Sequence, residues 1–203
     1  DTRKDLFVDL EAGTYQAAYQ RTWYVITEFR WRPLKALSVS FIPEFNKNVQ
    51  YSQWVDAFDD PTAVATFGRR YVFGFLNQNT VVGSIRLNWT FTPELSLQLY
   101  VQPLISAGDY SSFKELARAR SYAFRTYGEE GSTISEQDGS YTVDPDGNGP
   151  AAPISFDNPD FNFKSLRGNA VLRWEYLPGS TLYLVWTQNR ADDENTGEFR
   201  FNR

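Results

Sequence analysis

Hydrophobic and polar residues alternate position by position in one segment of the chain after another. The clearest segment has Gly83, Ile85, Leu87, Trp89 and Phe91 at one parity and Ser84, Arg86, Asn88, Thr90 and Thr92 at the other. Successive side chains of a β-strand point to opposite faces, so this period of two predicts a strand with one apolar face. Similar patterns predict about seven strands, at residues 6–12, 23–31, 37–46, 69–92, 95–102, 170–176 and 181–187.

The longest of these segments, Arg69–Thr92, keeps one parity throughout. We expect it to form a single long strand that extends beyond its neighbours and pairs with Leu37–Val55. The strands predicted here are antiparallel, because short connections separate most of them.

Three of the short connections follow the same pattern, in which two aromatic residues at alternate positions precede a proline. The aromatic pairs are Phe29 and Trp31, Trp89 and Phe91, and Trp174 and Tyr176, and the prolines are Pro33, Pro93 and Pro178. A new alternating segment begins soon after each proline, which predicts a tight turn. Rings at one level of an apolar face are typical of the interfacial aromatics of a membrane barrel, although the edge of a sandwich core is an alternative. A fourth short turn is expected at residues 1–4.

Two other connections, at about residues 46–68 and 107–162, are long and rich in Asp, Gly, Ser, Asn and Pro. Outer-membrane barrels combine short periplasmic turns with long extracellular loops. We therefore predict an all-β, antiparallel transmembrane β-barrel of the outer-membrane type, with residues 1–203 forming a single barrel segment in contact with a lipid bilayer. A soluble β-sandwich alternates in the same way and is the competing prediction.

The composition narrows the chemistry that this chain can perform. Aromatic residues make up 17% of its 203 residues, and it contains no Cys and no His. His-dependent triads, thiol nucleophiles and ordinary zinc sites each lack a required group. We therefore expect no enzyme activity, no catalytic residue and no bound cofactor. The net charge of −5 argues against a nucleic-acid partner.

Charged and amide side chains recur at the polar parity of the strands. They are Glu28, Arg30, Arg86, Asn88, Gln98, Arg173 and Glu175. In a barrel they face the lumen, where they either select solutes or form a satisfied network of ion pairs in a closed or plugged interior.

One segment matches the beginning of a calcium-binding loop. Asp144, Asp146, Asn148 and Gly149 follow the pattern D-x-D-x-N-G, but Ser155 occupies the twelfth position, where a bidentate Glu is expected. Calcium in the loop 144–149 and an ordinary Asp/Gly turn are therefore alternatives.

Long runs of the sequence also carry a family resemblance. They are YVFGFLNQNTVVGSIRLNWTFTPELSLQLYVQP, FKELARARSY, YTVDPDGNGPAAP and FNFKSLRGNAVLRWEYLPGSTLYLVWTQNR. These runs resemble the C-terminal barrel of the domain-of-unknown-function family 5916, in which a carbohydrate-binding-module-like domain precedes a membrane β-barrel. The resemblance implies no catalytic residues. It implies further strands before and after the chain, so we expect a fragment that cannot close alone, because single-chain bacterial barrels have even strand numbers.

These observations together predict a location in the bacterial outer membrane and a role as a membrane-spanning scaffold or channel. The barrel would anchor another module or belong to an envelope complex. Its expected partners are further strands of the same polypeptide or other envelope proteins, with a glycan as an additional candidate. The alternatives are a soluble β-sandwich binding module and a barrel enzyme whose catalytic groups lie outside this chain.

Overall fold

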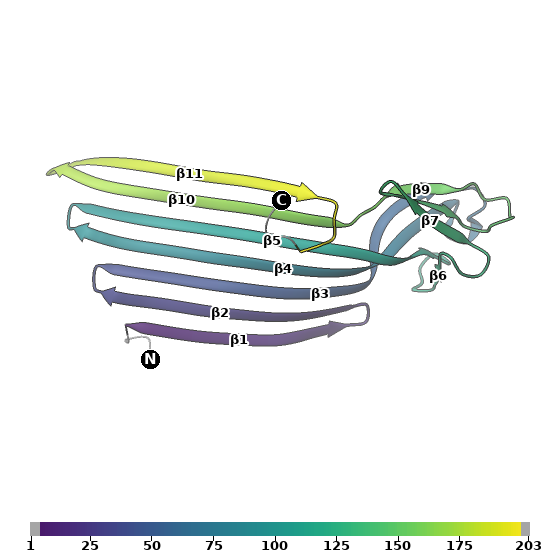
Figure 1. The fold of residues 1–203 in the computed structure, drawn as a ribbon, viewed down its shortest axis with the longest axis horizontal. Helices are drawn as coiled ribbons and strands as arrows, with labels where there is room; N and C mark the ends of the chain where they lie inside the picture. Colours follow the sequence, from purple (N-terminus) through teal and green to yellow (C-terminus); the bar gives the residue numbers. More distant parts are fainter. Residues whose placement is uncertain (1–4, 200–203) are drawn as a thin grey trace.

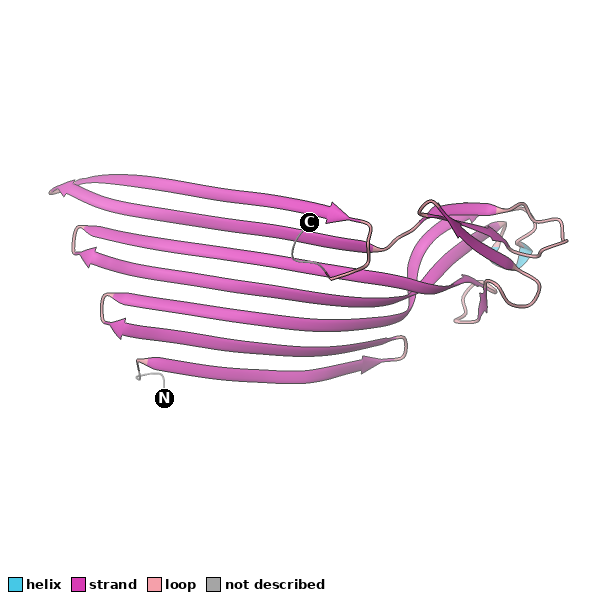
Figure 2. Ribbon diagram, in the orientation of Figure 1, coloured by secondary structure: helices cyan, strands magenta, loops and turns pink. Residues whose placement is uncertain are grey.

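The computed structural model describes residues 5–199 as two antiparallel sheets with almost no helix (Figure 1, Figure 2). The larger sheet has the strand order β1-β2-β3-β4-β5-β10-β11. Its strands are β1 (Leu6–Ala17), β2 (Gln20–Leu34), β3 (Leu37–Asp59), β4 (Arg69–Thr92), β5 (Leu95–Leu116), β10 (Phe161–Leu177) and β11 (Ser180–Glu194). The prediction of an all-β, antiparallel chain is confirmed.

Strands β3, β4 and β5 extend well past the other strands of the sheet. β3 and β4 pair from Leu37 opposite Trp89 to Asp59 opposite Arg69, which confirms the long strand that the sequence predicts. At the projecting end, Figure 1 shows these strands curving away from the plane of the sheet. Register shifts at Gln50/Gln53, Trp54/Asp56 and Phe73/Phe75 lie in this curved part, where β-bulges increase the local twist.

A second, smaller sheet packs against the projecting strands. Its order is β7-β8-β9, and the short strand β6 pairs with the end of β5. These elements are β6 (Phe124–Thr126), β7 (Thr133–Gln137), β8 (Ser140–Asp144) and β9 (Ile154–Asp157), and the 3-10 turn η1 (Val64–Thr66) lies between β3 and β4. We call the projecting ends of β3, β4 and β5, together with residues 60–68 and 117–160, the cap.

The expectation of polar loops at about residues 46–68 and 107–162 needs correction. Residues 46–59 belong to β3, residues 107–116 belong to β5, and the remainder contains the four short strands β6 to β9. Polar residues on a strand can face solvent on both sides beyond the apolar part of the sheet, so a polar composition did not distinguish these strands from loops.

The buried hydrophobic core of the described residues lies in the cap. Its members are Val72, Phe113, Tyr127, Val143, Ile154 and Phe156. The rings of Phe113 and Phe156 meet edge to face at 5.1 Å between centroids. The apolar residues of the short strands β8 and β9 therefore give this end of the molecule a core of its own.

The two ends of the larger sheet differ. At one end, two-residue turns connect β2 to β3, β4 to β5 and β10 to β11, next to Pro33, Pro93 and Pro178. This confirms the three short turns, and we call it the turn end. Pro33 itself lies in the last part of β2, beside a register shift. The turn expected at residues 1–4 lies outside the described residues.

The opposite end of the sheet joins the cap. There the turn between β1 and β2 meets the turn between β5 and β6 through Tyr19 and Tyr122, whose rings stack at 4.6 Å between centroids.

The larger sheet is open. Among residues 5–199, β1 pairs with β2 alone and β11 pairs with β10 alone, and Figure 1 shows them at opposite edges. β1 and β11 do not pair with each other, as expected from the odd number of long strands.

The core of the cap predicts that the two parts of the fold differ in their sensitivity to mutation. Phe113→Ala removes a buried ring that contacts Tyr141 and Phe156. We expect this substitution to lower the free energy of unfolding of the cap by roughly 3–5 kcal/mol. Limited proteolysis should then cut within residues 128–153 much faster than in the wild type, while fragments containing β1, β2 and β11 persist. Unchanged cleavage there would contradict a cap core centred on Phe113.

Candidate functional site

The register of the larger sheet gives it one polar face and one apolar face. Residues that pair directly across antiparallel strands lie on the same face. One row of paired residues crosses the polar face from edge to edge and consists of Phe7, Arg30, Ser40, Arg86, Tyr100, Asn169 and Thr187. The residues predicted to face a lumen, Glu28, Arg30, Arg86, Asn88, Gln98, Arg173 and Glu175, all have the parity of this face.

Four of the charged residues on the polar face form two ion pairs, each along one strand. Arg30 bonds to Glu28 on β2, and the Arg173 guanidinium lies 2.9 Å from the Glu175 carboxylate on β10. Arg86 lies instead over the ring of Tyr100, 5.1 Å from its centroid. Among the described residues, the polar face therefore contains both ion pairs and a cation without a carboxylate partner, and both interpretations of these residues stay predictions.

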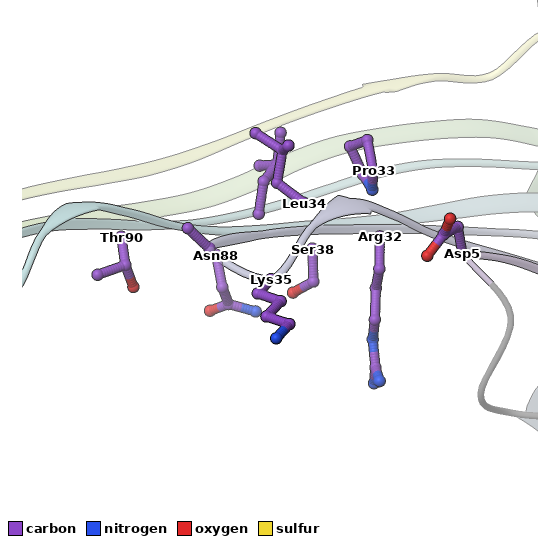
Figure 3. Close-up of a pocket in the computed structure, with 10 residues that line it drawn as sticks. Asp5, Arg32, Pro33, Leu34, Lys35, Ser38, Asn88 and Thr90 are labelled. Carbon is purple, nitrogen blue, oxygen red and sulfur yellow. The ribbon is translucent and has the colours of Figure 1, made fainter.

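The close-up of the turn end shows the two faces directly (Figure 3). Arg32, Lys35, Ser38, Asn88 and Thr90 extend to one side of the sheet, and Pro33 and Leu34 lie on the other. These residues, from both sides of the sheet, line a broad hollow of about 920 Å³ beside the β2–β3 turn.

The apolar face carries large side chains that no described residue covers. The exposed ones on β1, β2 and β11 include Leu6, Val8, Leu10, Trp23, Val25, Leu182, Leu184 and Trp186. The six aromatics predicted near the turns, Phe29, Trp31, Trp89, Phe91, Trp174 and Tyr176, are between 39% and 52% exposed. Trp89 and Phe91 approach to 4.3 Å between ring centroids, so the rings form local pairs at the turn end.

A buried cluster of charges stabilises the cap. Arg70 Nε donates to Asp60 Oδ2 at 2.5 Å, and Arg70 Nη1 donates to Glu115 Oε2 at 2.5 Å. The hydroxyl of Tyr127 donates to the same Glu115 oxygen at 3.3 Å, and Thr62 donates to Asp60 through both N–H and hydroxyl. The cluster thus joins the β3–β4 connection, β4, β5 and the segment after β6.

Sequence reasoning missed this cluster. Arg70 is separated from its two carboxylate partners by 10 and 45 positions. No local spacing signals such contacts, which depend on the register between β4 and β5.

The electrostatics of the cluster follow from its burial and its hydrogen bonds. Burial alone would raise the pKa of Asp60, but the hydrogen bonds from Thr62 and Arg70 outweigh it, and the pKa of Asp60 falls below its usual value. Burial, together with the charge of Glu115, raises the pKa of Tyr127. Asp60 therefore stays ionised and Tyr127 stays protonated over the physiological range, as the hydrogen bonds require.

The segment that resembles a calcium loop forms a compact turn at the end of β8. Asp144 Oδ1 accepts hydrogen bonds from the N–H groups of Asp146 and Gly147, and Asp146 Oδ2 accepts one from Ala151. The second oxygen of Asp146, Oδ1, is buried and has no hydrogen-bond partner among the residues that the structure describes. Within residues 5–199, no group of three or more His, Cys, Asp or Glu side chains is placed to hold a metal ion. Calcium binding by Asp144, Asp146 and Asn148 therefore stays a prediction.

Comparison with known proteins gives one match. A family model described as domain of unknown function (DUF5916) matches residues 1–203. No curated protein and no solved structure matches the chain. Among the described residues, no helix has both the length and the apolar character to cross a membrane.

The calcium prediction can be tested on the turn itself. If the loop 144–149 binds calcium, a chelator should speed proteolysis between Tyr141 and Pro153 and leave the larger sheet intact. Asp146→Asn should abolish the protection by calcium. Identical cleavage rates with calcium and with chelator would contradict calcium binding, and the loop would then be an ordinary Asp/Gly turn.

The charge cluster predicts how the cap responds to acid. Because the pKa of Asp60 is depressed in the folded protein, Asp60 contributes stability above its ordinary pKa of 3.8, and that stability is lost as pH falls through the folded-state value. We expect proteolysis of residues 117–132 to accelerate below about pH 4. In Asp60→Asn the cap should already be weakened at neutral pH and should show a smaller change on acidification. An equally steep acid response in both proteins would assign the effect to other groups.

Proposed function

The chain belongs to the DUF5916 family, a domain of unknown function, so we propose a function from the geometry of its sheet. The larger sheet forms part of the wall of a transmembrane β-barrel in the bacterial outer membrane. Its apolar face contacts lipid, and its polar face borders the interior. The barrel acts as a membrane-spanning scaffold or channel that anchors another module or belongs to an envelope complex.

The observation that carries this proposal is a bounded apolar band across the sheet. On β3 the apolar face runs from Leu37 to Phe45, which is nine residues (37–45), and on β4 it runs from Val81 to Phe91, which is eleven residues (81–91). Transmembrane strands need about 9–11 residues to cross the hydrocarbon core. The next pair on the same face, Lys47 opposite Asn79, is polar. The band therefore has the height of a membrane crossing.

The aromatic residues fit the two boundaries of this band. Trp31, Trp89 and Trp174 lie at the turn end, and Trp23 pairs with Lys47 at the other limit. Amphipathic rings prefer the zone between lipid tails and water. This distribution favours a lipid-facing surface over a surface that packs against protein.

A soluble β-sandwich would place a second sheet over the apolar band. The second sheet of the described residues, β7-β8-β9, belongs instead to the cap and packs there against the projecting ends of β4 and β5. Under the membrane proposal, the open edges at β1 and β11 pair with further strands of the same polypeptide or with other envelope proteins. Unpaired backbone groups in hydrocarbon would cost several kcal/mol each.

A pair of neighbouring substitutions tests which face contacts lipid. Val101 lies opposite Ile85 near the middle of the band, and the next residue, Gln102, lies on the polar face. We expect Val101→Arg to weaken folding into lipid vesicles by ~2–4 kcal/mol and Gln102→Arg to have a small effect. Folding would be followed by denaturant titration in phosphatidylcholine vesicles. Equal losses for both variants would contradict the assignment of faces.

The solvent requirement of the unmodified chain separates the membrane proposal from the sandwich. The membrane proposal requires detergent or lipid to keep the folded protein monodisperse, because the apolar band would otherwise be exposed to water. A monodisperse, folded chain in buffer without detergent would overturn it. The sandwich interpretation would then be the better one.

A further inference from the structure

Three cations on the polar face near the turn end have no carboxylate partner. Arg32, Lys35 and Arg86 form no ion pair within residues 5–199, whereas Arg30 and Arg173 on the same face do. The region thus concentrates positive charge in a chain whose net charge is −5.

The arginines of this group converge on one small hollow. Arg32 and Arg86 line a hollow of about 170 Å³ together with Arg30, and its other lining residues are Ser38, Val39, Ser40 and Asn88. Three guanidinium groups and three polar side chains therefore surround a space that no carboxylate lines. Residues from β2, β3 and β4 contribute to it.

Two neighbouring hollows extend the same surface along the sheet. The hollow of about 920 Å³ in Figure 3 shares Arg32, Ser38 and Asn88 with the small one and adds Lys35. A hollow of about 340 Å³ on the other side shares Arg86 and Asn88. The residues that it adds are Gln98, Leu99, Tyr100 and Asn169. Asp5, at the margin of the largest hollow, is the one carboxylate among the residues that line the three.

The chemistry of these side chains suits one class of ligand. Arginine and lysine donate hydrogen bonds and cannot accept them, while serine hydroxyls and the asparagine amide can donate as well. Like charges gathered at one place repel, and a bound anion removes that cost. The Tyr100 ring beneath Arg86 holds its guanidinium in place. Forked guanidinium groups bind oxyanions in two-point contacts, and several cations together favour a doubly charged phosphate over a carboxylate.

We propose that Arg32, Lys35 and Arg86 form a phosphate-binding site on the polar face of the sheet, which selects a phosphate-bearing solute. This inference rests on the proposed function for its place in the interior of a barrel, but the site itself is built by β2, β3 and β4. Arg32 and Arg86 bind the phosphate oxygens, and Ser38, Ser40 and Asn88 donate to the remaining lone pairs.

The test is a titration of the full chain with inorganic phosphate in detergent at low ionic strength, followed by calorimetry and by ³¹P nuclear magnetic resonance. Acetate and chloride titrations provide the comparison anions. We expect saturable binding of phosphate, with acetate weaker and chloride weakest. Arg86→Gln and Arg32→Gln should each weaken phosphate binding by roughly tenfold or more, the loss of a hydrogen bond to a charged group. Arg86→Lys should lose less than Arg86→Gln, because it keeps the charge.

Arg167→Gln is the matched control. Arg167 lies on the same face of the sheet, opposite Gln102, and lines none of the three hollows. Its substitution removes the same charge and should change phosphate binding less than twofold, as expected for a surface charge away from the site. Far-UV circular dichroism of each variant confirms that the sheet is folded before binding is compared.

The outcomes separate the failure of this inference from the failure of the membrane proposal. If the chain folds only in detergent and shows no saturable phosphate binding, the phosphate site is overturned and the membrane proposal is unaffected. An equal loss in Arg167→Gln would also overturn it, because a diffuse field would then explain the binding. Saturable binding that is lost in Arg86→Gln, in a chain that folds without detergent, would support the site and contradict the membrane wall.

Discussion

The hydrogen-bond register of the seven long strands is the constraint on which both surfaces of the sheet depend. A shift of one residue between two strands would move every apolar side chain of the moved strand to the opposite face. From Val81 to Trp89, β4 pairs with β3 and β5 without a register shift, and the shifts lie outside this stretch, at Gln50/Gln53, Trp54/Asp56, Phe73/Phe75 and Thr90/Thr92. Regular pairing is thus kept where the two faces differ most, and bulges occur where the chain turns or bends.

The interactions that stabilise the cap differ from those in the rest of the larger sheet. Its stability comes from a compact core around Val72 and Phe113 and from the buried bonds of Arg70 to two carboxylates. Such a cluster is costly to disrupt, because a buried charge without its partner retains its desolvation penalty. The cap therefore has a buried core of its own, while the rest of the sheet leaves many large apolar side chains exposed. The boundary between these two parts lies near Lys47 and Asn79.

The sequence predicted those features that depend on local periodicity. The alternation around Leu87 and Trp89 identified strands, parity and turns correctly, because side-chain direction on a strand has a fixed period. It did not predict the sheet of β7 to β9, whose strands have four or five residues each and lie among Gly, Asp and Pro. It also missed the bonds of Arg70 and the convergence of Arg32 with Arg86, since these contacts depend on which strands are neighbours. Closure into a barrel and binding of calcium remain predictions.

The stacked rings of Tyr19 and Tyr122 link the cap to the hairpin at the sheet's first edge. An aromatic pair of this kind contributes only about 0.5–1.5 kcal/mol beyond its buried area. This single contact is therefore small beside the buried core of the cap and the continuous pairing of β1 with β2. Because Tyr19 lies in the β1–β2 turn, the pair ties the end of an edge strand to the cap.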